Sequence, residues 1–149
     1  MSRHGYTDDC DDNWANIRWR GQVASAIRGK RGQTFLKELE VALLALPHKR
    51  LCLGVLSNGD DVCALGAVAV QREIKKGANS LDEAMQKIKQ ADPSELDAED
   101  TAAEMGIATQ LAQEIMFIND EWGYHGMAPE QRYNEVLSWV RKQIQEPRP

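Results

Sequence analysis

The sequence is poor in the features that assign a protein to a redox, secreted or membrane class. Its 149 residues include only three cysteines, at positions 10, 52 and 63, and this odd, scattered set suits a reducing cytosol better than a disulfide framework. No segment approaches the roughly 18 apolar residues of a membrane-spanning helix, and residues 1–9 contain no apolar signal-peptide core. We therefore expect a cytoplasmic protein without a membrane partner, in which Cys52 and Cys63 are small core residues.

Motifs for catalysis and cofactor binding are also missing. The sequence contains no Gly-x-Ser-x-Gly, P-loop, dinucleotide-binding or His-Glu-x-x-His run and no Cys-x-x-Cys pair. We predict no metal, no cofactor and, as the main expectation, no enzymatic activity. The exception is His125, which stands near Asp120 and Glu121 in a glycine-containing segment, so a small hydrolase or transferase that uses His125 for acid–base chemistry is an alternative.

One sign of charge is absent from a long part of the chain. Between Gln90 and Gln131 there is no lysine or arginine, although this stretch contains ten aspartates and glutamates. Residues 17–50 show the reverse pattern, with eight lysines and arginines against only Glu38 and Glu40. The net charge of −5 therefore hides two oppositely charged segments. The sequence leaves open whether they neutralise each other within the fold.

The length and composition predict one globular domain. Hydrophobic residues make up 42% and charged residues 28% of the chain, which is ordinary for a protein that buries one core in water. Residues 1–13 are polar and acidic, so we expect a flexible acidic arm there and a single domain over 14–149.

Apolar residues at helical spacing predict about six helices. The first covers 14–28, and the second follows Gly32 and ends at Pro47, with a broad apolar stripe. Ser80 and Glu83 form a capping box before the third, two more meet near Gly106, and Pro129 opens the last. The stripe of the second helix consists of Phe35, Leu36, Leu39, Ala42, Leu43 and Leu46.

A β-hairpin is predicted between the second and third of these helices. The apolar runs 51–56 and 62–68 flank Asn58-Gly59, which is the strongest short signal for a two-residue hairpin turn. Both faces of such a hairpin would be apolar and must be covered, and the second strand can turn helical after Gly66. The predicted fold class is α+β, mostly α, with about six helices packed around one short antiparallel β-hairpin.

Basic residues between 18 and 31 are candidates for binding an anion or a nucleic acid. In the run 28–32 (RGKRG), glycines that allow close backbone approach stand beside three cations at the start of a helix. The alternative is that these glycines only turn the chain, and that the cations complement the end of the first helix. Arg18 and Arg20 stand near Trp14 and Trp19, and together they could bind single-stranded nucleic acid by base stacking and phosphate pairing. The candidates are Arg18, Arg20, Arg28, Lys30 and Arg31.

The acidic part of the chain is a second candidate surface. Residues 101–115 have the helix–glycine–helix outline of a DNA-binding helix-turn-helix. They lie in a stretch without lysine or arginine, which would repel phosphate. We therefore expect a packed corner of two helices instead. The acids of 90–131 can dock on a basic partner, although helix-start acids also stabilise the helix dipole. Residues 119–128 are predicted to form an aromatic loop, whose protein-interaction candidates are Asp120, Glu121, Trp122, Tyr124 and His125.

Several short runs resemble a known group of proteins. They are RGKRGQTFL (28–36), VCALGA (62–67), MGI and INDE (105–107 and 118–121) and PEQR (129–132). They resemble uncharacterised small proteins of bacteriophages, prophages and their bacterial hosts over roughly residues 15–145. The resemblance implies a genomic context and carries over no activity and no site residue.

The leading functional hypothesis is therefore a non-enzymatic protein-interaction module that binds another protein through the acidic region 90–131 or the aromatic loop 119–128. By analogy with other small acidic phage proteins, it would bind or inhibit a protein machine of the host. The alternative from a different class is a nucleic-acid or phosphate binder that acts through the basic region 18–50.

Overall fold

The computed structural model describes residues 13–52, 57–58, 61–91, 98–120 and 127–145. The predicted arm lies outside this part of the chain, except for Asn13, which begins the first helix. Within the described ranges there are seven helices and two strands of two residues each, so the prediction of a mostly helical protein is confirmed. The helices are α1 (Asn13–Arg28), α2 (Lys30–Ala45), α3 (Ala64–Lys75), α4 (Leu81–Ala91), α5 (Ala98–Met105), α6 (Thr109–Asp120) and α7 (Pro129–Gln143), and the strands are β1 (Ser57–Asn58) and β2 (Asp61–Val62).

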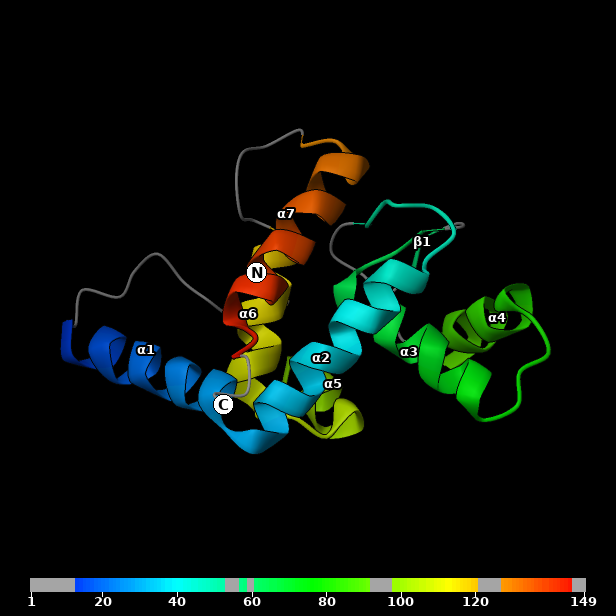
Figure 1. The fold of residues 1–149 in the computed structure, drawn as a ribbon. Coiled ribbons are helices and arrows are strands. Elements are labelled where there is room, and N and C mark those ends of the chain that lie inside the picture. Colours follow the sequence, from blue (N-terminus) through cyan, green and yellow to red (C-terminus); the bar gives the residue numbers. More distant parts are fainter. Residues whose placement is uncertain (1–12, 53–56, 59–60, 92–97, 121–126, 146–149) are drawn as a thin grey trace.

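Helix α2 lies at the centre of the packing. It contacts α1, α3 and α7, while α6 contacts α1, α3, α5 and α7. Figure 1 shows α1 and α4 at opposite ends of the molecule, with α2 and α3 between them. The predicted stripe of α2 is buried along its whole length, because its spacing places every member on the inner side of the helix.

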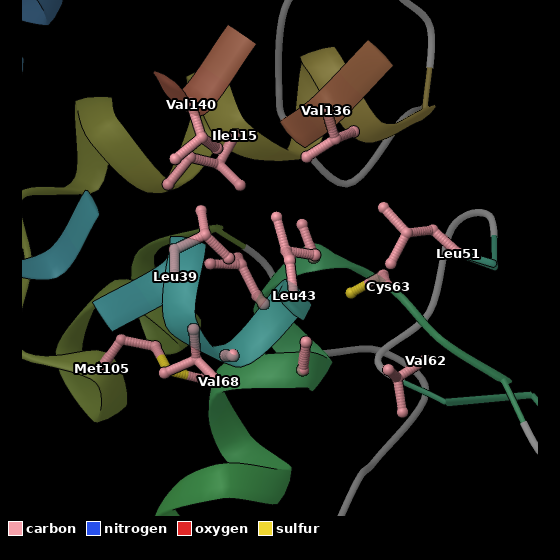
Figure 2. Packing of buried hydrophobic residues seen from close by; sticks show 14 of the residues in the cluster. Leu39, Leu43, Leu51, Val62, Cys63, Val68, Met105, Ile115, Val136 and Val140 are labelled. Atoms are coloured by element: carbon pink, nitrogen blue, oxygen red, sulfur yellow. The ribbon is translucent and has the colours of Figure 1, made fainter. Parts of the chain in front are cut away.

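Residues of α3, α5, α6 and α7 and of the chain around the strands form the core together with α2. In Figure 2, Leu39 and Leu43 of α2 lie between Ile115, Val136 and Val140 on one side and Val68 and Met105 on the other. Figure 2 also shows that Leu51, Val62 and Cys63 extend the same core. Large apolar side chains with almost no exposed surface dominate it, so its burial is the main term that stabilises the fold.

The second predicted strand is shorter than expected. The run 62–68 was expected to be a strand that can turn helical after Gly66, but only Val62 belongs to β2, and α3 begins already at Ala64 and continues to Lys75. This helix raises the number of helices from about six to seven. All of Ala64–Val68 is buried, so the run has no polar face that would reveal its period. A continuous apolar run does not distinguish a buried helix from a buried strand.

The strands pair in a different register from the one predicted. Ser57 lies opposite Val62 and Asn58 lies opposite Asp61 in an antiparallel pair, whereas Asn58 was expected within the turn. Leu51 forms a single parallel bridge with Val62 instead of an antiparallel strand, and residues 53–56 lie outside the described ranges. The expectation that this region is covered on both sides holds for its described residues, since Leu51, Cys52, Val62 and Cys63 are all buried.

A buried side-chain amide connects this region to the helices. Asn119, near the end of α6, is only 1% exposed. Its Oδ1 accepts a hydrogen bond from the backbone N–H of Ala64 at 3.0 Å, and its Nδ2 donates to the carbonyl of Cys52 at 2.9 Å. The amide therefore satisfies the first N–H of α3 and fixes the chain at Cys52 at the same time.

Several helix ends follow the sequence signals. Glu83 N–H donates to the Ser80 hydroxyl at 3.1 Å, as the predicted capping box requires, although the Glu83 carboxylate accepts from Asn79 N–H. Pro129 is the first residue of α7. The end of α2 is stabilised by Lys49, whose ammonium donates to the carbonyls of Leu44 and Leu46 at 2.6 and 2.7 Å.

The predicted corner at Gly106 is a packed one. Gly106 has a φ of +74° and ends α5 with hydrogen bonds back to Ala102. Helix α6, which would be the recognition helix of a helix-turn-helix, buries half of its residues and contains no lysine or arginine to contact phosphate. None of the described helices is both long enough and apolar enough to cross a membrane.

We predict that Asn119→Ala lowers the free energy of unfolding by about 2 to 4 kcal/mol, because the buried Ala64 N–H would lose its Asn119 acceptor and the Cys52 carbonyl would lose its Asn119 donor. Denaturant titration followed by circular dichroism measures this change. Asn134→Ala, at an exposed position of α7, is the matched control and should change stability by less than about 0.5 kcal/mol. Equal losses in the two variants would contradict a capping role for Asn119.

Candidate interaction surface

The two acids of the basic segment are both bonded to cations from other helices. Glu38 accepts two hydrogen bonds from Arg72 of α3, from Nε at 2.9 Å and from Nη2 at 2.8 Å. Glu40 accepts one from Nε of Arg141 of α7 at 3.1 Å. These pairs hold the two flanks of α2 against its neighbours, and they leave neither carboxylate to neutralise the cations of its own segment.

Arg72 links a third helix to this arrangement. Its Nη2 also donates to the carbonyl of Met105, the last residue of α5, at 3.1 Å. The hydrogen bond from Arg72 holds the pKa of Glu38 below its ordinary value of 4.5, and the charges of Arg72 and Lys75 act in the same direction against partial burial. The pKa of Arg72 is raised in turn by its hydrogen bond to Glu38.

All five predicted anion-binding cations are exposed. Arg18, Arg20 and Arg28 lie on α1, and Lys30 and Arg31 begin α2. None of them forms an ion pair among the residues that the structure describes, and the same is true of Lys37. These six cations are therefore not paired with the described acids of the later helices, whereas Arg50 of the same segment pairs with Asp61 of β2.

The glycines of the basic run serve the corner between α1 and α2. A Cβ on Gly32 would lie 1.8 Å from the carbonyl oxygen of Ala26, so only glycine allows the two helices to approach this closely. The neighbouring Gln33 donates from Nε2 to the carbonyl of Ile27 at 2.7 Å and to that of Gln143 at 3.0 Å. The close backbone approach is therefore made to the protein itself, as the alternative prediction of a chain-turning role has it.

The outer side of α2 carries apolar residues that the sequence did not single out. Lys30, Thr34, Lys37, Val41 and Leu44 recur every three or four residues and are all exposed. Val41 is 62% and Leu44 46% exposed, and with Ile17 at 61% they are the large apolar side chains exposed among the described residues. The available signal was that 41 and 44 fall outside the buried stripe.

A cavity of about 330 Å³ lies between the segment after α2, strand β2 and helix α4. Its polar wall includes the ion pair of Arg50 and Asp61, whose Nη2 and Oδ1 atoms are 3.1 Å apart. His48 and Asp82 also line it, and the lining contains no serine, threonine or cysteine to act as a nucleophile. The sequence did not predict this cavity, because its walls come from three separate segments.

Asn119 and Asp120, which were predicted to begin the aromatic loop, belong to α6 instead. Of the five interaction candidates of that loop, the structure describes one. Asp120, the last residue of α6, is half-buried, and its Oδ1 accepts a hydrogen bond from Nδ2 of Asn119 at 2.7 Å. The other candidates lie outside the described ranges; they are Glu121, Trp122, Tyr124 and His125.

The acidic segment contributes a more modest surface. Glu99 and Glu104 of α5 are exposed, and Glu99 lies in the first turn, where a carboxylate stabilises the helix dipole. In the described ranges, no group of three or more histidine, cysteine, aspartate or glutamate residues is arranged to hold a metal ion.

Comparison of the chain with protein-family models, curated proteins and solved structures finds no significant match. The resemblance to phage and prophage proteins therefore stays a prediction.

We predict that Gly32→Ala and Gly21→Ala have opposite effects on stability. Gly32→Ala should lower the free energy of unfolding by about 1 to 3 kcal/mol, because backbone atoms of α1 must move. Gly21 lies on exposed α1 with nothing within 4 Å of an added Cβ, so Gly21→Ala should raise it by about 0.5 to 1 kcal/mol. Thermal and denaturant unfolding measure both, and a neutral Gly32→Ala would disprove the close approach.

The ion pair between Glu38 and Arg72 should make stability depend on pH. Because the folded pKa of Glu38 is lowered, the pair stabilises the protein above the ordinary value of 4.5, and this contribution is lost as pH falls through the folded pKa. Glu38→Gln should therefore lower the free energy of unfolding at neutral pH. The loss should be only about 1 to 2 kcal/mol, because both side chains of the pair are partly exposed. The difference in the free energy of unfolding between Glu38→Gln and the unmodified protein should shrink below pH 4.5. The exposed Glu104→Gln is the control, and a pH-independent difference for Glu38→Gln would contradict the pairing.

Proposed function

We propose that this chain is a non-enzymatic interaction module that binds an acidic surface of another protein through its basic segment, residues 17–50. The observation that carries the proposal is that the cations of α1 and α2 are exposed without described acidic partners, while Glu38 and Glu40 are bonded to Arg72 and Arg141. Uncompensated charges create a field that extends about 8 Å at physiological salt and steers an oppositely charged partner.

The apolar residues favour a protein over a nucleic acid as the partner. The exposed large apolar side chains of the described ranges are Ile17, Val41 and Leu44, and all three lie in the basic segment. Protein interfaces combine apolar contacts in the centre with polar groups around them, whereas a phosphate backbone offers no apolar surface for these side chains. A net charge of −5 also opposes the approach of a polyphosphate to the rest of the molecule.

Two other candidate functions have weaker support. Binding of single-stranded nucleic acid at Arg18 and Arg20 would need a nearby aromatic ring for stacking. Of the two tryptophans predicted for this role, Trp19 is half-buried, and the side chain of Trp14 lies outside the described ones. A hydrolase or transferase would use His125, which lies outside the described residues. The resemblance to phage proteins favours a protein of the bacterial host as the partner, and an inhibitory effect on that protein is part of the proposal.

We predict that Arg28→Gln/Arg31→Gln weakens binding to the partner about five- to thirtyfold, which corresponds to losing two exposed charge pairs of about 0.5 to 1 kcal/mol each. The purified chain is immobilised and exposed to bacterial lysate, and captured proteins are quantified by mass spectrometry at low and high salt. Proteins that depend on the basic segment should be acidic and should be lost at high salt.

Lys76→Gln/Lys87→Gln is the matched control, since it removes the same charge from Lys76, which follows α3, and from Lys87 of α4. It should retain the partner. Titration with duplex DNA and with single-stranded RNA at low salt tests the competing class, because a nucleic-acid binder would bind both tightly and lose affinity steeply with salt. Equal capture by both double variants, or tight binding of nucleic acid that Arg28→Gln/Arg31→Gln abolishes, would overturn the proposal.

A further inference from the structure

The outer face of α2 stands between two basic rims. The outer face consists of Lys37, Val41 and Leu44, which are exposed on the side of α2 that faces away from the core. On one flank, the pair of Glu38 with Arg72 attaches α3, and on the other flank the pair of Glu40 with Arg141 attaches α7. The face is thus a narrow apolar strip on a helix that is fixed from both sides.

Each rim has a lysine in addition to the arginine that pairs with α2, so both rims keep an excess of positive charge. On the α3 side, Lys75 is exposed and close enough to Glu38 to lower the pKa of that carboxyl. On the α7 side, Arg141 and Lys142 are exposed, and Arg141 is the partner of Glu40. A molecule that covers the outer face therefore meets cations along both of its edges.

A hollow on the α7 rim adds a place for a side chain. It measures about 390 Å³ and is lined by Asn134, Leu137, Ser138, Arg141 and Lys142. Leu137 provides an apolar surface within it, and Arg141 connects it to α2 through Glu40.

We propose that the outer face of α2 is the docking site for an acidic amphipathic helix of the partner protein, an inference that rests on the proposed function. An apolar stripe on such a helix would cover Val41 and Leu44, and its carboxylates would lie against the two basic rims. Charge complementarity selects this occupant, because the edges are positive and the centre is apolar.

A second copy of the chain fits the face less well. The acidic helix α5 exposes Glu99, Asp100, Ala103 and Glu104, and none of these supplies a large apolar side chain for the strip. Two copies of α2 packed against each other would bring Lys37 and the rims of like charge together. The charges and the apolar centre thus point to a different protein.

The test uses the full chain and a synthetic acidic peptide of roughly five helical turns. In this peptide, leucines recur on one face and all other positions are glutamate or alanine. A second peptide has the same composition with the leucines spread around the helix, so that its charge is identical. Binding is measured by fluorescence anisotropy, and the contact surface is mapped by amide chemical shifts of the isotope-labelled chain.

The amphipathic peptide is expected to shift the amide resonances of Lys37, Val41, Leu44 and Leu137. The scrambled peptide should bind at least about tenfold more weakly, because it cannot bury an apolar stripe. Val41→Asp/Leu44→Asp should abolish binding while the helical circular dichroism signal is kept, since both positions are exposed. Gln86→Asp/Ala103→Asp is the matched control, because it adds the same two negative charges at exposed positions of α4 and α5, and it should bind normally.

Other outcomes separate this inference from the proposed function. Equal binding of the two peptides, or full binding by Val41→Asp/Leu44→Asp, would overturn docking on the outer face. If Val41→Asp/Leu44→Asp still captures the acidic partner from lysate and Arg28→Gln/Arg31→Gln does not, the inference fails and the proposed function stands. Self-association that Val41→Asp/Leu44→Asp abolishes in sedimentation experiments would assign the face to a second copy and overturn the inference as well.

Discussion

The buried amide of Asn119 is the constraint on which the arrangement of the central helices depends. It accepts from the first N–H of α3 and donates to the carbonyl of Cys52, so the end of α6 positions both the start of α3 and the chain that leads to the strands. An unpaired amide at this depth would be destabilising, and the hydrogen bonds therefore specify one geometry. Because α3 packs against α2, that geometry also sets the position of α2.

The ion pairs that hold α2 have a second effect, on the charge of the surface. Glu38 and Glu40 attach the helix to α3 and α7, and in doing so they are withdrawn from the lysines and arginines around them. Exposed ion pairs contribute little stability individually. Their arrangement matters more here for the field, because it leaves a positively charged surface on a protein whose net charge is negative.

Parts of the fold were predictable because local signals and burial agree. The inner stripe of α2, the capping box at Ser80 and the start of α7 at Pro129 each follow from a spacing or a residue type that acts over one or two turns. The candidate cations were also found by counting charges. What the sequence did not contain was the identity of their neighbours: whether Arg28 or Lys30 meets a carboxylate depends on segments far away in the chain.

The sequence by itself determined the helical class, the core stripe of α2 and the polarity of charge along the chain. Tertiary structure decided that Ala64–Val68 is helical, because the run is buried all around and the amide that caps it comes from Asn119, 55 residues away. It also decided that Val41 and Leu44 are exposed together beside two basic rims. Periodicity reports one face of one helix, whereas pairing and exposure depend on how several helices meet in space.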